Sequence, residues 1–234
     1  MYESGILAQV TGGALKPGGI DLTARALLLA GAKPTDKILD LGCGMGTTLH
    51  TLEQSGCSAF GLDLSNQLIM QAKRFNPRAA LINANAARFP LVANSLDLII
   101  AECSITATGE VFTTLCECAR VLRPGGRLVI SDIYARKPEA VSMLRGLPFA
   151  CGVSNAFVLS DLQNILQQLR FVVRSIEDHS QAISALSAAI CKPTGSAAGF
   201  WSKAEPAVDP FDLQIALARA KLGYFILIAT KTEK

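Results

Sequence analysis

The sequence has few aromatic side chains and few histidines: aromatic residues make up 6% of its 234 residues, and there are one tryptophan and two histidines. Although half of the residues are hydrophobic, no run reaches the roughly 18 apolar residues that a membrane-spanning helix needs. The chain does not open with a basic stretch followed by an apolar run, so the sequence predicts no signal peptide. We therefore expect a cytoplasmic protein that does not bind a membrane.

The sequence also lacks blocks of like charge. Its 22 basic and 19 acidic residues are scattered along the chain. Because the sequence has no cluster of Lys and Arg with interleaved aromatics, we expect no nucleic-acid partner. No repeat, low-complexity tract or charged linker divides the chain, which predicts one domain over residues 1–234. The seven cysteines, an odd number, argue against a disulfide framework.

Apolar strand patterns and amphipathic helix patterns alternate along the chain. This rhythm predicts an α/β fold, with a mostly parallel sheet covered by helices on both faces. Ser65 is placed to cap one of the helices. The predicted strands are 37–41, 58–62, 81–83, 96–101, 127–133, 171–176 and 224–230, and the predicted helices are 22–30, 47–54, 65–75, 110–122, 160–169, 178–190 and 211–221.

A glycine-rich turn follows the first predicted strand and carries the strongest functional signal. Its residues are Asp40-Leu41-Gly42-Cys43-Gly44-Met45-Gly46, and a predicted helix begins directly after them. Glycines at such a turn let a ligand approach the bare backbone. Asp63 ends the second predicted strand, where a carboxylate can accept hydrogen bonds from both hydroxyls of a ribose. The G-x-G-x-G spacing differs from the G-x-G-x-x-G of dinucleotide-binding enzymes, which makes a nicotinamide oxidoreductase the weakest of the functions considered.

This turn resembles that of class I S-adenosylmethionine-dependent methyltransferases, and further motifs extend the resemblance along the chain. Residues 85–90 (Asn-Ala-Ala-Arg-Phe-Pro) resemble the family's Asp-Ala-x-x-Leu-Pro, 95–99 its S-F-D-x-V and 122–128 its L-x-P-G-G-x-L. The resemblance implies a Rossmann-like seven-stranded sheet of order 3-2-1-4-5-7-6, with strand 7 antiparallel. It also implies that Asn85, in place of the family's aspartate, accepts a hydrogen bond from the adenine amino group while the Ala86 amide donates to the ring. The residues expected to bind S-adenosylmethionine, or its product S-adenosylhomocysteine, are Asp40, Gly42, Cys43, Gly44, Gly46, Asp63, Leu64, Asn85, Ala86 and Glu102.

Two segments outside the expected core are candidates for covering the cavity. Residues 1–36 are interpreted as an N-terminal helical cap, in which Lys16-Pro17-Gly18-Gly19 either folds over the donor, as in similar enzymes, or forms a plain exposed turn. Residues 134–158 are interpreted as a possible substrate lid. Additions this short favour a small-molecule acceptor.

The favoured function is methyl transfer to a small molecule by in-line displacement, for which the protein supplies mainly alignment. No residue is assigned a catalytic role, and His50 and His179 are interpreted as structural. One alternative follows from a resemblance to arsenite methyltransferases, in which Cys103 and Cys151 would bind a trivalent metalloid substrate. That family's further N-terminal cysteines are missing here, and both thiols could equally be packing residues. A non-catalytic donor-binding protein is the other alternative, and no resident metal is expected.

Overall fold

The computed structural model describes residues 16–148, 151–204 and 207–233. Residues 1–15 of the expected N-terminal cap and residues 149–150 of the expected lid therefore lie outside the described residues. No helix in the described ranges is both long and apolar enough to cross a membrane.

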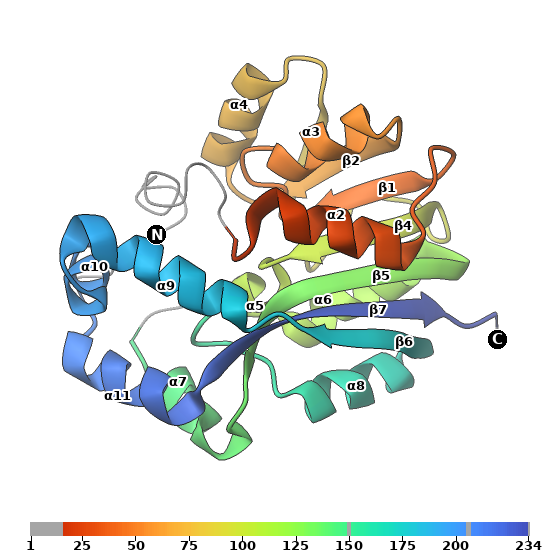
Figure 1. Cartoon of the computed structure of the whole chain (residues 1–234). Coiled ribbons are helices and arrows are strands. Elements are labelled where there is room, and N and C mark those ends of the chain that lie inside the picture. Colours follow the sequence, from red (N-terminus) through yellow and green to blue (C-terminus); the bar gives the residue numbers. More distant parts are fainter. Residues whose placement is uncertain (1–15, 149–150, 205–206, 234) are drawn as a thin grey trace.

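A single seven-stranded sheet forms the centre of the molecule, in the order β3-β2-β1-β4-β5-β7-β6 (Figure 1). The strands from β1 to β5 pair in parallel, whereas β7 is antiparallel to both of its neighbours. This order and the antiparallel β7 confirm the fold implied by the sequence motifs. The strands are β1 (Lys37–Leu41), β2 (Ser58–Asp63), β3 (Ala80–Asn83), β4 (Leu96–Glu102), β5 (Leu122–Ala135), β6 (Phe171–Asp178) and β7 (Leu222–Lys231).

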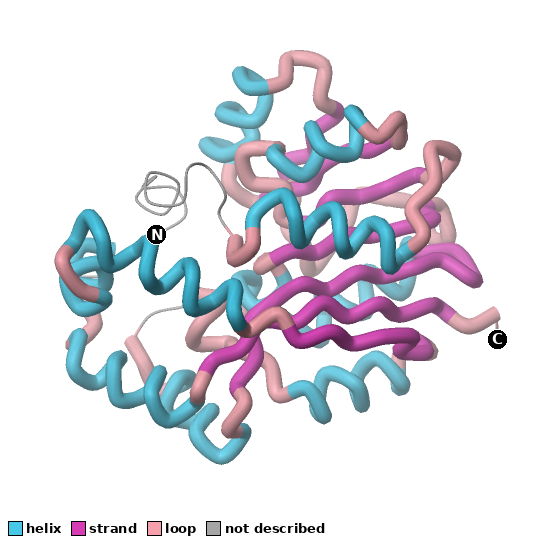
Figure 2. Tube along the Cα trace, in the orientation of Figure 1, coloured by secondary structure: helices cyan, strands magenta, loops and turns pink. Residues whose placement is uncertain are grey.

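Helices cover both faces of the sheet, as the tube view shows (Figure 2). Because successive side chains of a strand point to opposite faces, Ile38 of β1 packs in one apolar cluster with Ala26 and Leu52, from the helices on one face. Leu39 packs in a second cluster with residues of the helices on the other face, such as Leu115. The helices are α2 (Gly19–Ala30), α3 (Thr47–Gln54), α4 (Asn66–Phe75), α5 (Ile105–Thr108), α6 (Val111–Val121), the short 3-10 helix η1 (Pro138–Ala140), α7 (Val141–Arg145), α8 (Leu159–Gln168), α9 (Gln181–Thr194), α10 (Ala197–Ala204) and α11 (Pro210–Ala220).

Several local predictions are confirmed and some boundaries are corrected. Ser65 caps α4, where its hydroxyl accepts a hydrogen bond from the Leu68 amide at 3.2 Å. The helix expected over 178–190 begins later, because Asp178 pairs with Phe225 and so extends β6. The fifth strand begins at Leu122 rather than at Arg127. The short helices α5, η1, α7 and α10 were not predicted.

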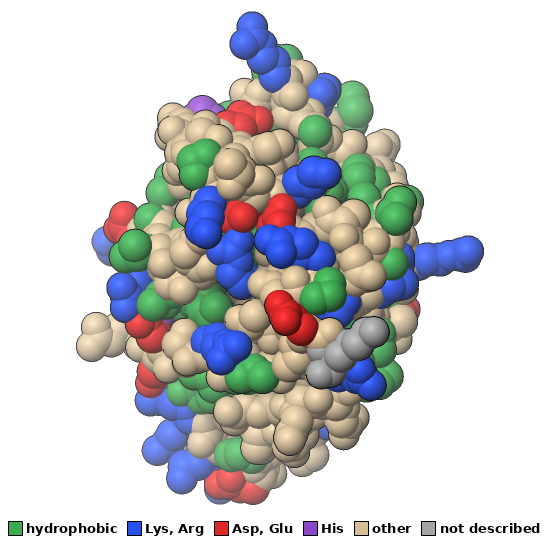
Figure 3. Space-filling view, turned by 90° about the vertical axis from the view of Figure 1, so that its right-hand side faces the viewer, with side chains coloured by type: hydrophobic (Ala, Val, Ile, Leu, Met, Phe, Trp, Pro, Cys, Tyr) green, Lys and Arg blue, Asp and Glu red, His purple; other side chains and the backbone are tan. Residues whose placement is uncertain are grey.

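The two ends of the sheet differ in character. Figure 1 shows α9, α10, α11 and α7 gathered beyond the carboxyl ends of the parallel strands. At the opposite end, basic side chains lie among acidic and apolar ones (Figure 3). Ion pairs at that end include Arg127 with Asp36 at 2.6 Å and Arg123 with Asp97 at 2.5 Å. The end that carries the carboxyl termini of β1, β2 and β4 holds the cavity described next.

Candidate functional site

A cavity of about 600 Å³ opens at the carboxyl ends of β1, β2 and β4. Strand order reverses between β1 and β4, and ligands of open α/β sheets bind at this kind of switch point. The volume lies within the range of small-molecule sites. Its wall consists of Lys16, Gly19, Ile20, Asp40, Leu41, Gly42, Cys43, Gly44, Met45, Thr47, Thr48, Leu62, Asp63, Leu64, Ser65, Leu68, Asn85, Ala86, Glu102, Cys103, Ser104, Ala107, Thr108 and Glu110.

The glycine-rich turn forms one side of this cavity. Gly42 has a φ of +73°, and a Cβ added there would lie 2.4 Å from the Cβ of Ser104, so only glycine fits. The amides of Gly42 and Cys43 both donate to the carbonyl of Leu62, at 2.8 and 3.1 Å. Gly46 does not line the cavity; it has a φ of +83° at the start of α3, and a Cβ there would lie 3.3 Å from Ala72. The described geometry thus gives Gly46 a role in helix packing, while Gly42 and Gly44 face the cavity.

Asp63 stands at the end of β2, where its carboxylate is half-buried in the cavity wall. One carboxylate oxygen accepts a hydrogen bond from the Gly44 amide at 2.8 Å, and the other accepts one from the Ser65 amide at 2.9 Å. A carboxylate offers about four acceptor positions, so both oxygens retain capacity for a ligand hydroxyl. The two backbone bonds fix the orientation of the carboxylate.

Asn85 and Ala86 form a further part of the wall after β3. The side-chain oxygen of Asn85 accepts a hydrogen bond from the Ala87 amide at 2.7 Å. That bond forms an Asx turn, and it leaves one lone pair of the side-chain oxygen for a ligand. Leu64, which is 70% exposed, adds apolar surface to the same cavity.

Asp40 gives the cavity an unusual buried carboxyl group. The residue is 2% exposed, and its Oδ2 atom has no hydrogen-bond partner among the described residues. Burial raises the pKa of Asp40 to about 8, and the negative charges of Glu102 and Asp63 add to the rise. A buried acceptor without a partner is costly, which points to a ligand group as its partner.

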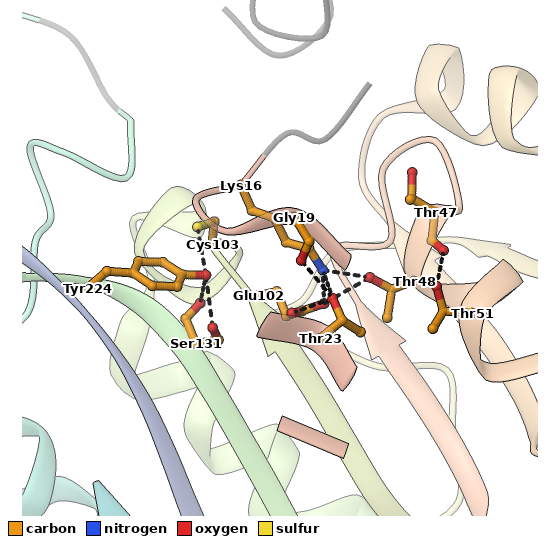
Figure 4. A network of polar contacts seen from close by, with 10 residues as sticks. All are labelled: Lys16, Gly19, Thr23, Thr47, Thr48, Thr51, Glu102, Cys103, Ser131 and Tyr224. Carbon is orange, nitrogen blue, oxygen red and sulfur yellow. Dashed lines mark hydrogen bonds and ion pairs between the residues drawn. The ribbon is translucent and has the colours of Figure 1, made fainter. Parts of the chain in front are cut away.

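Lys16 brings a cation into the same cavity (Figure 4). Its ammonium group forms an ion pair with Glu102 at the end of β4 and donates hydrogen bonds to the hydroxyls of Thr23, at 2.5 Å, and Thr48, at 2.9 Å. Both hydroxyls in turn donate to Glu102, at 3.1 and 2.8 Å. Three elements of the fold, α2, α3 and β4, therefore meet at one polar cluster.

Comparison with known proteins agrees with this geometry. The methyltransferase domain family matches residues 39–130, from β1 into β5. A demethylmenaquinone methyltransferase of Beutenbergia cavernae is 34% identical over 116 residues, which cover 49% of this chain and 48% of that protein. An uncharacterized methyltransferase of Synechocystis sp. is 29% identical over 148 residues, covering 60% and 68% of the two chains. The chain spans about half the length of the first curated relatives it matches.

Over residues 39–130 the chain is thus similar to class I S-adenosylmethionine-dependent methyltransferases. Solved structures share the fold at lower identity. The [4+2]-cyclase SpnF superimposes with a TM-score of 0.79 at 20% identity, covering 100% of this chain and 93% of that one. A phosphoethanolamine N-methyltransferase 2 of Haemonchus contortus, in complex with S-adenosyl-L-methionine, gives a TM-score of 0.75 at 17% identity. This match covers 98% of the present chain and 57% of the other. Because a fold hosts several activities, these two structures support the architecture alone.

Cys103 lies in the wall of the cavity in a strained conformation, with a φ of +51°. Its thiol donates to the hydroxyl of Tyr224 at 3.6 Å, and that hydroxyl also accepts a bond from Ser131 at 2.8 Å (Figure 4). Burial, with the charge of Asp132, raises the pKa of Cys103 well above its usual value. The group therefore stays a thiol near neutral pH.

Cys151 lies elsewhere in the methyltransferase fold. It is 2% exposed and packs in an apolar cluster with Val141, Leu144 and Ala216, and it is not part of the cavity wall. The structure thus brings Cys103 to the cavity but not Cys151. The described residues also contain no group of three or more His, Cys, Asp or Glu side chains that could hold a metal ion.

Nearly all residues expected to bind the donor come together in the cavity wall; Gly46 is the exception. His50 bonds to Gln54 at 3.0 Å, His179 bonds to Glu177 at 3.1 Å, and neither lines the cavity. The sequence did not indicate the partners of Glu102, which are Lys16, Thr23 and Thr48. Lys16 lies in the segment considered as a cover, but no local pattern indicates its partner Glu102.

Proposed function

We propose that this protein transfers a methyl group from S-adenosylmethionine to a small-molecule acceptor. The observation that carries the proposal is the convergence of the glycine-rich turn, Asp63 and the buried Asp40 on one cavity of about 600 Å³. The names of the methyltransferase relatives support the same donor.

The cavity wall offers a partner to each part of this donor. The oriented carboxylate of Asp63 can accept hydrogen bonds from the ribose hydroxyls. Leu64, Asn85 and Ala86 can flank and read the adenine. The methionine part would then reach the glycine turn and Asp40, whose Oδ2 atom is buried without a partner among the described residues.

Methyl transfer from a sulfonium needs little from the protein beyond alignment. A lone pair of the acceptor forms the new bond to the methyl carbon while the sulfur–carbon bond breaks and its electrons return to sulfur, which leaves S-adenosylhomocysteine. Correct alignment in a dry site contributes about 7–11 kcal/mol to such reactions. Cys103, Ala107 and Thr108 line the part of the cavity formed after β4, where we place the acceptor.

The acceptor is proposed only as a small molecule. Among the relatives, one is named a demethylmenaquinone methyltransferase and another a malonyl-[acyl-carrier protein] O-methyltransferase. These names differ in acceptor, and the matches to this chain cover less than half of its length at 34% and 29% identity. The segment 134–158 remains our candidate for closing over the acceptor, and 1–36 for covering the donor.

The metalloid alternative has less support. A metalloid is bound by thiolates, whereas burial raises the pKa of Cys103 and Cys151 lies in a separate apolar cluster. A donor-binding protein without catalysis would show the same donor affinity as an enzyme. It would be recognised by tight donor binding without turnover of any acceptor.

Calorimetric titration with S-adenosylmethionine, S-adenosylhomocysteine and NAD tests the proposal. We expect the first two to bind and NAD not to bind. Asp63→Ala should weaken the binding of S-adenosylhomocysteine by about 1.5–3 kcal/mol, the usual value for hydrogen bonds to a charged group. Asp97→Ala is the matched control, because Asp97 also accepts a backbone hydrogen bond, from Lys37 at 2.7 Å, but lies outside the cavity wall. Binding of NAD alone, or equal affinity in both variants and the wild type, would overturn the assignment.

A further inference from the structure

We propose that Glu102, Thr23 and Thr48 form a receptor for the α-ammonium group of the methyl donor, and that Lys16 occupies this receptor in the free protein. On binding, the donor's ammonium group replaces that of Lys16 on Glu102, and Lys16 turns to the donor's α-carboxylate. This inference rests on the proposed function, because it takes S-adenosylmethionine as the ligand of the cavity.

The receptor is built from three acceptors that regular elements hold in place (Figure 4). Thr23 lies on α2, Thr48 on α3 and Glu102 at the end of β4. Their oxygens surround the Lys16 ammonium group, and the side chains of Lys16 and Glu102 are only 10% and 4% exposed. The two hydroxyls also donate to Glu102, which orients them with their lone pairs toward the cation. This arrangement matches the three N–H bonds of a primary ammonium group.

Lys16 uses all of its donors on this receptor. An ammonium group has three N–H bonds, and Glu102, Thr23 and Thr48 take one each. A ligand can therefore gain a hydrogen bond from Lys16 only if Lys16 gives up a bond to the wall. The amino-acid end of the donor carries the same chemical group and can replace it one for one.

The charges of the cavity favour an exchange over simple expulsion of Lys16. Lys16 is the one Lys, Arg or His in the described cavity wall, while Asp40, Asp63, Glu102 and Glu110 are acidic. A donor carboxylate placed in such a wall without a cation would be repelled. After the exchange, the donor ammonium pairs with Glu102 and the donor carboxylate pairs with Lys16, so every charge of the amino-acid end has a partner.

The backbone identifies Lys16 as the partner that can move. It precedes α2, and after Pro17 come Gly18 and Gly19, both with positive φ, at +73° and +52°. Glycine changes its backbone conformation at low cost. Glu102, Thr23 and Thr48, in contrast, belong to a strand and two helices packed in the core.

Three ligands that share the adenosine part separate the steps of this exchange. Methylthioadenosine lacks the amino-acid end, S-adenosyl-3-thiopropylamine has the ammonium group without the carboxylate, and S-adenosylhomocysteine has both. Lys16→Met removes the competing ammonium group. We expect it to tighten S-adenosyl-3-thiopropylamine roughly tenfold, a change typical of one hydrogen bond to a charged group. The affinity for methylthioadenosine should be unchanged. The affinity for S-adenosylhomocysteine should rise by less than about tenfold, because this ligand loses Lys16 as the partner of its carboxylate. Lys33→Met, at an exposed lysine outside the cavity wall, is the control.

Other outcomes would overturn the exchange. Unchanged or weaker binding of S-adenosyl-3-thiopropylamine to Lys16→Met would mean that Lys16 does not compete for the receptor. An equal change for all three ligands would give Lys16 a purely structural role. Thr48→Val is a second test, for the case that Lys16→Met does not fold. This variant should bind both amino-bearing ligands more weakly and methylthioadenosine as tightly as the wild type does. Equal weakening of the binding of all three ligands would refute the receptor. If none of the three ligands binds the wild type, the proposed function itself fails, which separates the two failures.

Discussion

Replacing Asp40 with Asn should remove a pH dependence from donor binding. Asp40 is buried beside Glu102 and Asp63, and its pKa is raised to about 8. S-adenosylmethionine carries a sulfonium charge that S-adenosylhomocysteine lacks, and a nearby cation favours the ionised form of a carboxyl group. Binding of the sulfonium should therefore lower the pKa of Asp40 and release a proton.

The size of this effect follows from the pKa of the free protein. A group with a pKa of about 8 costs about 1.4 kcal/mol to ionise for each pH unit below that value. The preference of the wild type for S-adenosylmethionine over S-adenosylhomocysteine should thus rise with pH, by up to about tenfold per unit, and level off above pH about 8.

Calorimetry with both ligands between pH 6 and 9, on the wild type and on Asp40→Asn, measures the effect. The variant corrects for titration of the ligands themselves, because Asn at this position does not ionise. Parallel curves for the two proteins would refute the assignment of the pH dependence to Asp40.

The same carboxyl group makes a prediction for stability. Its pKa in the folded protein, about 8, is above the ordinary value of 3.8 for an aspartate, so the folded state holds a proton that the unfolded state loses. The stability from this proton is fully present below pH about 4 and is lost as the pH rises through about 8. In urea unfolding, the free energy of unfolding of Asp40→Asn should rise relative to that of the wild type by about 1.4 kcal/mol per pH unit across this window. A difference that does not change with pH would contradict the raised pKa.

Three further predictions concern residues in or next to the cavity wall. Asn85→Leu should reduce the preference for S-adenosylhomocysteine over S-inosylhomocysteine, which lacks the adenine amino group; an unchanged preference would remove Asn85 from adenine recognition. Gly61→Ala should lower the free energy of unfolding by about 1–3 kcal/mol, because the added Cβ would lie 2.6 Å from the sulfur of Cys43; an unchanged urea midpoint would contradict this contact. Cys103, whose pKa is raised, should react with iodoacetamide at pH 8 much more slowly in the native protein than in urea, as peptide mass spectrometry would show, and equal rates would contradict the raised pKa.

The features that could be predicted from sequence are those encoded by neighbouring residues. The glycine turn, Asp63 at the end of a strand, and the Ser65 cap each depend on short-range patterns, and the structure places all of them as expected. Helix α10 was not predicted, because Gly199 in its first turn lowers helix propensity. Gly46 belongs to the same G-x-G-x-G motif as Gly42 and Gly44, but it packs against Ala72 and does not line the cavity.

The features that could not be predicted depend on contacts between distant parts of the chain. Lys16 and Glu102 are 86 residues apart, and Cys103 and Tyr224 are 121 apart. Their approach follows from the strand order, which brings the end of β4 next to α2 and β7 next to β5. The separation of Cys103 from Cys151 likewise became visible only when the segment after β5 was seen to pack against α11.

A crystal structure of the protein with S-adenosylhomocysteine tests the central claim most directly. The account predicts that the ribose hydroxyls bind the carboxylate of Asp63 and that the homocysteine ammonium group lies on Glu102, next to Asp40. S-adenosylhomocysteine found outside this cavity, or bound in it with the ribose away from Asp63, would contradict the account.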